Sequence, residues 1–224
     1  MIEEIKQILN QESKENTKEF NQKILNTKLP ILGVNTPFLR QYAKQICKQD
    51  FRLFLKECDR SSYELTLLEA FVIAGAKMSI DERFKLLDEF IPIIGDWAVH
   101  DGLVSSLKCS KKYPKEMLEY ILKYKDSTKE FEVRFVAVML MVYYLNEEYA
   151  DKAFEVVKTL MANDYYAKMG IAWFLATAII EYPEKVYSYL DNTSDKDIIL
   201  MTIRKVRDSY RVSPMEKEKI LQYK

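Results

Sequence analysis

Helical periodicity recurs along almost the whole chain, and the breaks between successive helical segments are only a few residues long. Apolar residues repeat at helical spacing from Ile2 to Leu9, and comparable patterns return in segment after segment up to residue 223. Helices joined by such short loops pack as antiparallel hairpins. Only 5 Gly and 6 Pro occur among 224 residues, which disfavours architectures with many tight turns. The sequence therefore predicts an all-α protein.

Several polar residues stand where helices are expected to begin, because a side-chain oxygen there can accept a hydrogen bond from a free backbone N–H. The segment Ser61-Ser62-Tyr63-Glu64 resembles a capping box, with Glu64 as its second member. The other expected N-caps are Thr36 (before Pro37), Asp50, Ser79, and Ser127 or Thr128.

Long apolar helices alternate with shorter charged helices at roughly 35-residue spacing, a pattern typical of helical-repeat proteins. No long linker interrupts the chain. We therefore expect a single domain, residues 1–224, built as an α-α superhelix (solenoid) of degenerate repeats. The alternative architecture is an irregular orthogonal helical bundle.

The composition sets limits on function. Lys and Arg (34) balance Asp and Glu (34), so net charge predicts neither a nucleic-acid nor a membrane partner. The polar amino-terminal segment and the lack of an apolar run of about 18 residues predict neither a signal peptide nor a membrane span. The 3 cysteines have no zinc or redox spacing, which predicts reduced thiols in a cytoplasmic protein. No metal or cofactor motif is present, and one His gives little support to a His-dependent nucleophilic mechanism.

Two charged residues stand in otherwise apolar helices. Asp101 follows Trp97 by one helical turn, and Arg134 is the only charge between Glu132 and Glu147. A buried charge without a partner costs several kcal/mol. Each of the two therefore needs a buried partner, such as a salt bridge in a dry core, or must face a wet cleft.

The residues spaced at helical intervals around Asp101 are expected to share one helix face with it. Trp97 and Asp101 are four residues apart, and Lys108 lies near the same face. His100 points about 100° away from Asp101 on a helix, so it is interpreted as structural. A core role for Trp97 and a local pairing of Asp101 remain the simpler alternative.

A second tryptophan and two basic segments complete the candidate residues. Trp173 is surrounded by small residues that would allow close helix contact, and a core role is the simpler interpretation. Residues 108–125 contain 6 Lys or Arg against 2 Asp or Glu, and residues 196–224 contain 8 against 4. Within the second segment Arg204, Arg207 and Arg211 are spaced to form a stripe on one helix face. These segments are either phosphate contacts or ordinary solvated faces.

Five segments together resemble the AlkD-like family of DNA alkylation repair proteins, which are built from HEAT-like helical repeats. The first contains Gly33-Val34-Asn35-Thr36-Pro37-Phe38-Leu39-Arg40, similar to the family pattern Gly-Val-x-Thr-Pro-x-Leu-Arg. The matching segments are residues 31–44, 96–101, 133–135, 165–173 and 203–213. They span almost the whole chain in the family's order.

The resemblance implies a DNA glycosylase that excises positively charged N3- and N7-alkylated purines from double-stranded DNA. It implies that Asp101, Trp97 and Trp173 are the catalytic residues and that Arg134 holds a backbone phosphate. Such proteins need not flip the base into a pocket. The candidate DNA contacts are Arg134, Arg204, Arg207, Arg211, Lys108 and Arg40. A monomer without cofactor is expected.

The sequence departs from active members of the family in two respects. They typically have Arg three residues after the second tryptophan, where this chain has Ala176, and they are usually basic. Fewer phosphate contacts predict weaker and less salt-dependent DNA binding. A glycosylase is the favoured hypothesis. The alternatives are a non-catalytic DNA-binding scaffold and a protein-interaction solenoid.

Overall fold

The computed structural model describes residues 1–224 and consists of α-helices and short 3-10 turns, without strands. The predicted all-α class is confirmed. None of the helices has the length and apolar character needed to cross a bilayer. The chain forms two compact units, Met1–Tyr113 and Pro114–Lys224. The expectation of a single domain over residues 1–224 stays a prediction.

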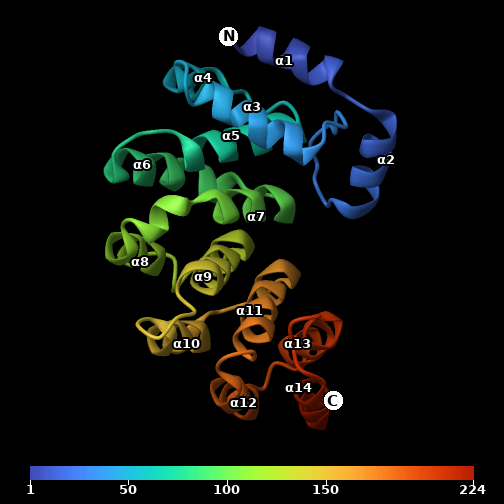
Figure 1. The fold of residues 1–224 in the computed structure, drawn as a ribbon, viewed down its shortest axis with the longest axis vertical. Helices are drawn as coiled ribbons and strands as arrows, with labels where there is room; N and C mark the ends of the chain where they lie inside the picture. Colours follow the sequence, from blue (N-terminus) through green and yellow to red (C-terminus); the bar gives the residue numbers. More distant parts are fainter. The chain divides into compact units, whose positions relative to one another are not determined.

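The first unit is centred on one apolar helix. Its elements are α1 (Ile2–Gln11), α2 (Glu15–Ile24), α3 (Thr36–Ile46), α4 (Phe51–Glu57), α5 (Tyr63–Gly75), α6 (Ile80–Phe90), η1 (Ile91–Ile93), α7 (Trp97–Ser106) and η2 (Lys108–Lys111). Helix α5 packs between α3 and α7 (Figure 1). Residues 63–74 are buried on every side of α5, as expected for a helix that is apolar all round.

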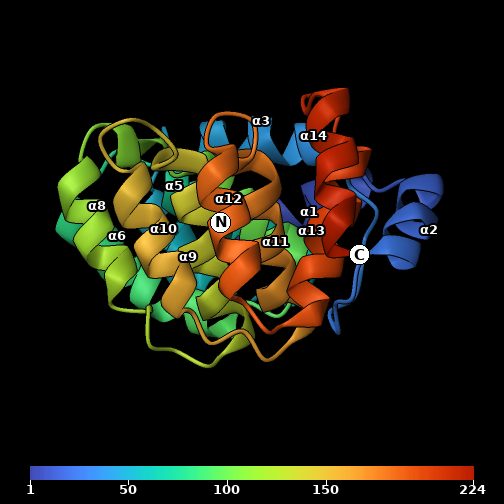
Figure 2. The same cartoon turned by 90° about the horizontal axis from the view of Figure 1, so that it is seen from below.

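The second unit has a comparable arrangement. Its elements are α8 (Pro114–Leu122), α9 (Glu130–Tyr143), α10 (Ala150–Thr159), α11 (Tyr165–Ala178), α12 (Pro183–Asn192), α13 (Lys196–Asp208), α14 (Pro214–Lys219) and η3 (Ile220–Tyr223). Helix α11 packs against both α9 and α13 (Figures 1 and 2). The amphipathic α10 and α12 flank α9 and α11. Within each unit this alternation is the predicted helical-repeat packing, and the HEAT-like assignment stays a prediction.

Two glycines allow central helices to approach each other closely. A Cβ on Gly102 of α7 would lie 2.7 Å from Cδ1 of Leu67 on α5. A Cβ on Gly170 of α11 would lie 3.3 Å from Cγ of Arg134 on α9. Because these distances are shorter than ordinary contacts between carbon atoms, a larger residue at Gly102 would displace the Leu67 side chain, and one at Gly170 would crowd the Arg134 side chain.

The N-caps predicted from the sequence are confirmed only in part. Asp50 accepts a hydrogen bond from Leu53 N, and Ser79 accepts one from Glu82 N, so both predicted caps are confirmed. The predicted cap Thr36 is wrong. It is the first residue of α3, and Asn35 caps the helix by accepting from Phe38 N at 2.9 Å.

The expected start of the Arg134 helix at Ser127 or Thr128 is also wrong. Helix α9 begins at Glu130. The Ser127 hydroxyl instead accepts a hydrogen bond from Lys129 N at 3.1 Å and donates one to Glu132 at 2.7 Å. Ser127 therefore stabilises the turn that precedes the helix.

The expected capping box at residues 61–64 is wrong because Glu64 has a different role. Ser62 caps α5 by accepting from Leu65 N. The fully buried Glu64 carboxylate accepts from the backbone N–H groups of Leu32 (2.9 Å), Gly33 (2.7 Å) and Val34 (3.3 Å). Gly33 has φ +98°, a conformation that favours glycine. One carboxylate thus fixes the loop that leads into α3.

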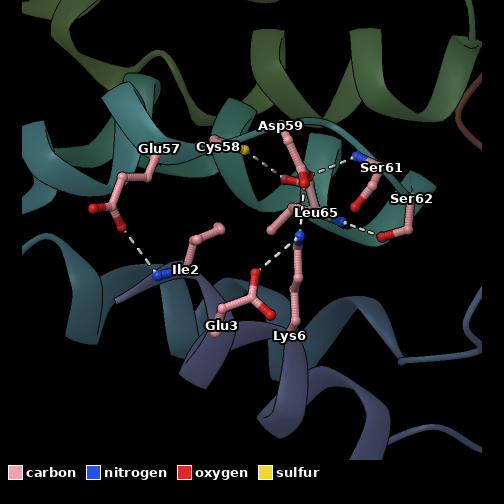
Figure 3. A network of polar contacts seen from close by, with 9 residues as sticks. All are labelled: Ile2, Glu3, Lys6, Glu57, Cys58, Asp59, Ser61, Ser62 and Leu65. Atoms are coloured by element: carbon pink, nitrogen blue, oxygen red, sulfur yellow. Dashed lines mark hydrogen bonds and ion pairs between the residues drawn. The ribbon is translucent and has the colours of Figure 1, made fainter.

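A polar network attaches α1 to the end of α4 and to the segment that follows it (Figure 3). The Lys6 ammonium lies 2.6 Å from Oδ2 of Asp59 and 3.3 Å from Oε1 of Glu3. The backbone N of Ile2 donates to Glu57 at 3.2 Å. The first helix is thereby held by charged groups as well as by its buried apolar face.

The three cysteines are free thiols. Burial raises the pKa of Cys47 and of Cys109, and it raises the pKa of Cys58 to about 12. The Cys58 sulfur lies 3.9 Å from the Leu65 carbonyl oxygen (Figure 3).

Candidate functional site

Helix α7 starts at a buried carboxylate. Asp96 Oδ1 accepts hydrogen bonds from Ala98 N at 2.7 Å and Val99 N at 3.3 Å. Burial raises the pKa of Asp96, and the nearby charge of Asp101 raises it further. This cap fixes the start of the helix, so that Trp97 occupies its first position and Asp101 lies one turn later.

Trp97 connects α7 to α2. Its indole N–H donates to the carbonyl oxygen of Ile24, the last residue of α2, at 3.2 Å. The side chain is half-buried. Trp97 is therefore neither a fully buried core residue nor a free surface residue, and part of it remains available for contact.

Asp101 is oriented by its neighbour in the sequence. Its Oδ1 lies 2.7 Å from Nδ1 of His100, whose side chain is fully buried, whereas the Asp101 side chain keeps 19% of its surface exposed. Sequence reasoning separated the two residues because adjacent helix positions point about 100° apart. Side-chain torsions nevertheless bring them together, and only their adjacency could have suggested this contact.

Arg40 is held against the carboxyl-terminal end of α7. Its guanidinium donates to Ser106 Oγ at 2.7 Å and to Ser105 Oγ at 3.2 Å. The same group lies over the Phe71 ring, 4.3 Å from its centroid. Burial lowers the pKa of Arg40. Arg40 and the exposed Lys108 both line one cavity of about 580 Å³ in the first unit.

Arg134 is buried in the second unit, with 3% of its surface exposed. Its Nη1 donates to the carbonyl oxygen of Tyr166 at 3.0 Å, and its guanidinium carbon lies 5.9 Å from the centroid of the Trp173 ring. Gly170 leaves the space that this side chain occupies. Arg134 is therefore fixed between α9 and α11.

Trp173 has a second cation close to it. The Lys205 ammonium lies 5.3 Å from the ring centroid, within the range of a cation–π interaction. Lys205, Trp173 and Ala176 line one hollow of about 250 Å³. Lys205 was not among the predicted site residues. Its position beside Arg204, within a basic segment, was the signal that could have identified it.

The other basic candidates lie at the carboxyl-terminal end of α13 and beyond it. Arg204 and Arg207 are exposed and line a common hollow of about 390 Å³. Arg211 is also exposed, but α13 ends at Asp208, so the predicted stripe of three arginines on one helix is wrong. The chain leaves the helix before Arg211 because the Ser209–Ser213 segment turns into α14.

Each unit thus combines a half-buried tryptophan with ionic groups: a carboxylate on α7 in the first, and cations on α9 and α13 in the second. These features define an all-α protein with charged groups fixed on its central helices. A family model described as DNA alkylation repair enzyme matches residues 5–206. The chain belongs to this family, which gives it a role in DNA repair with DNA as its partner.

The matched region contains Trp97, Asp101, Arg134 and Trp173, and it ends just before Arg207. No curated protein matches the chain.

Proposed function

We propose that the protein is a DNA glycosylase that releases cationic N3- and N7-alkylated purines by hydrolysing the N-glycosidic bond, without flipping the base. The observation that carries this proposal is the Asp101 carboxylate. It is partly exposed, it is oriented by His100 at 2.7 Å, and it shares a face of α7 with Trp97. The substrate is alkylated double-stranded DNA, and the protein acts as a monomer without cofactor.

The chemistry requires little acid catalysis. The C1′–N bond breaks with both electrons moving to the base, and this neutralises the base's positive charge. The deoxyribose becomes oxocarbenium-like, and water adds to C1′ while its proton leaves to solvent. A fixed carboxylate at Asp101 stabilises the developing positive charge and orients the water. The products are a neutral alkylpurine and an abasic site.

The two tryptophans would serve this reaction differently. The face of a tryptophan ring favours a nearby cation through its quadrupole. Trp97 lies on the same helix face as Asp101 and is assigned to the sugar. The Trp173 ring already lies near Arg134 and Lys205, which supports a role in holding these cations toward DNA.

The phosphate contacts are assigned to basic side chains of both units. Arg134 remains the leading candidate, but it is 3% exposed and its guanidinium already donates to the Tyr166 carbonyl oxygen, so a phosphate contact requires this side chain to be uncovered. The remaining assigned contacts are Arg204, Arg207, Arg211, Lys108 and Arg40.

The test is release of 7-methylguanine or 3-methyladenine from alkylated duplex DNA. Asp101→Asn removes the charge with little change in shape, and we expect release to fall by about 10²-fold or more. Asp81→Asn, an exposed position on α6, is the matched control and should release bases like the wild type. Equal release by Asp101→Asn and the wild type would remove Asp101 from the mechanism.

A non-catalytic DNA-binding scaffold is the second candidate. It is favoured by the buried Ala176, which stands where active relatives typically have Arg, and by the balanced charge of the chain. Duplex binding without base release from alkylated DNA would establish this alternative. A protein-interaction solenoid, the third hypothesis, predicts no DNA binding even at low salt.

A further inference from the structure

The cavity of about 580 Å³ in the first unit is lined by five cationic side chains and by no acidic one. Arg40, Lys44 and Lys48 come from α3 and the residues after it, Lys77 follows α5, and Lys108 follows α7. We call this feature the basic cavity. In a chain with equal numbers of acidic and basic residues, five cations without an acidic neighbour are a marked local imbalance.

The four lysines of the basic cavity form no ion pair. Other lysines of this chain do: the Lys6 ammonium lies 2.6 Å from Asp59, and the Lys168 ammonium lies 2.7 Å from Asp197. Cations gathered in a hollow with apolar walls focus their field into it. The basic cavity should therefore attract an anion from solution.

Arg40 is already positioned for such an anion. Two of the five guanidinium N–H donors go to Ser105 and Ser106, and the Phe71 ring covers one face. The remaining donors have no protein acceptor. A partly buried guanidinium without a carboxylate is incompletely compensated, and an oxyanion that binds in two-point geometry would complete it.

Helix dipoles offer a simpler reason for the lysines, because α3, α5 and α7 all end at the basic cavity. Each helix end carries about half a negative charge, so three ends supply about −1.5 charges. Five cations exceed this by about 3.5 charges. Dipole compensation therefore accounts for only part of the cluster.

We propose that the basic cavity binds a phosphate group of the DNA backbone, a site that rests on the proposed function. Ser105, which lines the cavity, follows Asp101 by four residues on α7, so the two residues lie about one helical turn, roughly 6 Å, apart along the helix axis. A phosphate held by Arg40 and the lysines lies next to the sugar that faces Asp101. The basic cavity thus fixes the position of the DNA strand relative to the Asp101 carboxylate.

The experiment compares two double variants of equal charge change in duplex binding by fluorescence anisotropy over a range of salt concentrations. Lys44→Ala with Lys77→Ala removes two cavity cations. Lys56→Ala with Lys85→Ala, on α4 and α6, removes two exposed lysines that also lack ion pairs. We expect the cavity variant to bind unmodified duplex about 10-fold more weakly at low salt, with the salt slope reduced by about 2. The control should keep the wild-type slope.

Three outcomes would overturn the proposal. Equal losses in both double variants would mean that only overall charge matters, while the proposed function stands. Absence of duplex binding by the wild type would remove both the cavity proposal and the proposed function. A third arm titrates inorganic phosphate into the protein without DNA, followed by NMR. The cavity variant could lose phosphate binding and still bind duplex DNA like the wild type. This result would assign the cavity to a free phosphate anion.

Discussion

A single buried carboxylate determines the conformation of the loop before α3. Glu64 is completely buried and accepts three backbone N–H groups, from Leu32, Gly33 and Val34. Buried carboxylates are stable when amide donors surround them in this way. The local sequence around Glu64 suggested a helix cap, and only the fold shows that the loop about thirty residues earlier uses this side chain.

Replacing Glu64 should therefore lower the free energy of unfolding far more than a substitution on the surface does. Glu64→Ala leaves two buried donors and one partly buried donor without an acceptor, and we expect a loss of about 3–5 kcal/mol in the free energy of unfolding. Glu64→Gln keeps one acceptor oxygen and should lose less. Urea denaturation measures both. Similar stability of Glu64→Ala and the wild type would contradict the role assigned to this carboxylate.

Lys205 is a single residue whose replacement we expect to change DNA binding. Its ammonium lies 5.3 Å from the centroid of the Trp173 ring and lines the same hollow as Ala176. We expect Lys205→Ala to weaken duplex binding by roughly 5–10-fold and to lower the salt slope by about 1. Lys196→Ala, exposed at the start of the same helix, is the control. An equal loss in both variants would exclude a specific role for Lys205.

At the scale of helices, the sequence predicts caps only where the partners are local. Asp50 and Ser79 each accept from an N–H three residues later, which a local pattern can show. Thr36 and Asn35 are both acceptable caps by residue type, and backbone geometry decides between them. The length of α9 likewise depends on the turn that Ser127 stabilises.

The start of α13 shows how a cap and an ion pair combine. Asp195 accepts from Asp197 N at 3.0 Å and Ile198 N at 3.1 Å, and it lies 3.0 Å from the Lys168 ammonium of α11. Burial alone would raise the pKa of Asp195, but the hydrogen bond from Lys168 and the backbone donors hold it below its ordinary value.

This arrangement predicts a pH-dependent effect of Asp195→Ala. The variant should lose about 1–2 kcal/mol of stability at neutral pH. Because the folded-state pKa is depressed, the stabilisation is complete above the unfolded-state pKa of about 3.9 and disappears as pH falls through the lower folded-state value. Asp195→Asn keeps the cap and should lose less. Thermal unfolding at pH 7 and pH 3 tests this, and an equal difference at both pH values would contradict the assignment.

On the scale of the whole molecule, periodicity and short loops sufficed to predict the all-α class and the helical-repeat packing. The site was less accessible to prediction. The contact of His100 with Asp101, the Lys205 ammonium near Trp173 and the basic cavity all depend on side-chain directions or on helices that meet only in the fold. Sequence spacing shows which residues share a face, but not what that face touches.

The number of basic side chains assigned to phosphates sets an expectation for the salt dependence of DNA binding. Ten basic side chains are assigned to phosphates when the three further lysines of the basic cavity and Lys205 are included, which limits the slope of log affinity against log salt to about −9. We expect wild-type binding to unmodified duplex to follow a slope no steeper than this. A steeper slope in an anisotropy titration would show that further lysines take part, and a slope near zero would be incompatible with phosphate contacts.

The raised pKa of the cysteines has a consequence for a member of a DNA alkylation repair family. Methylating agents attack thiolates much faster than thiols, and with a pKa of about 12 Cys58 is almost entirely protonated at neutral pH. Burial raises the pKa of Cys47 and Cys109 in the same direction. Burial thus keeps these thiols in the protonated form, which reacts slowly with electrophiles of the kind that alkylate DNA.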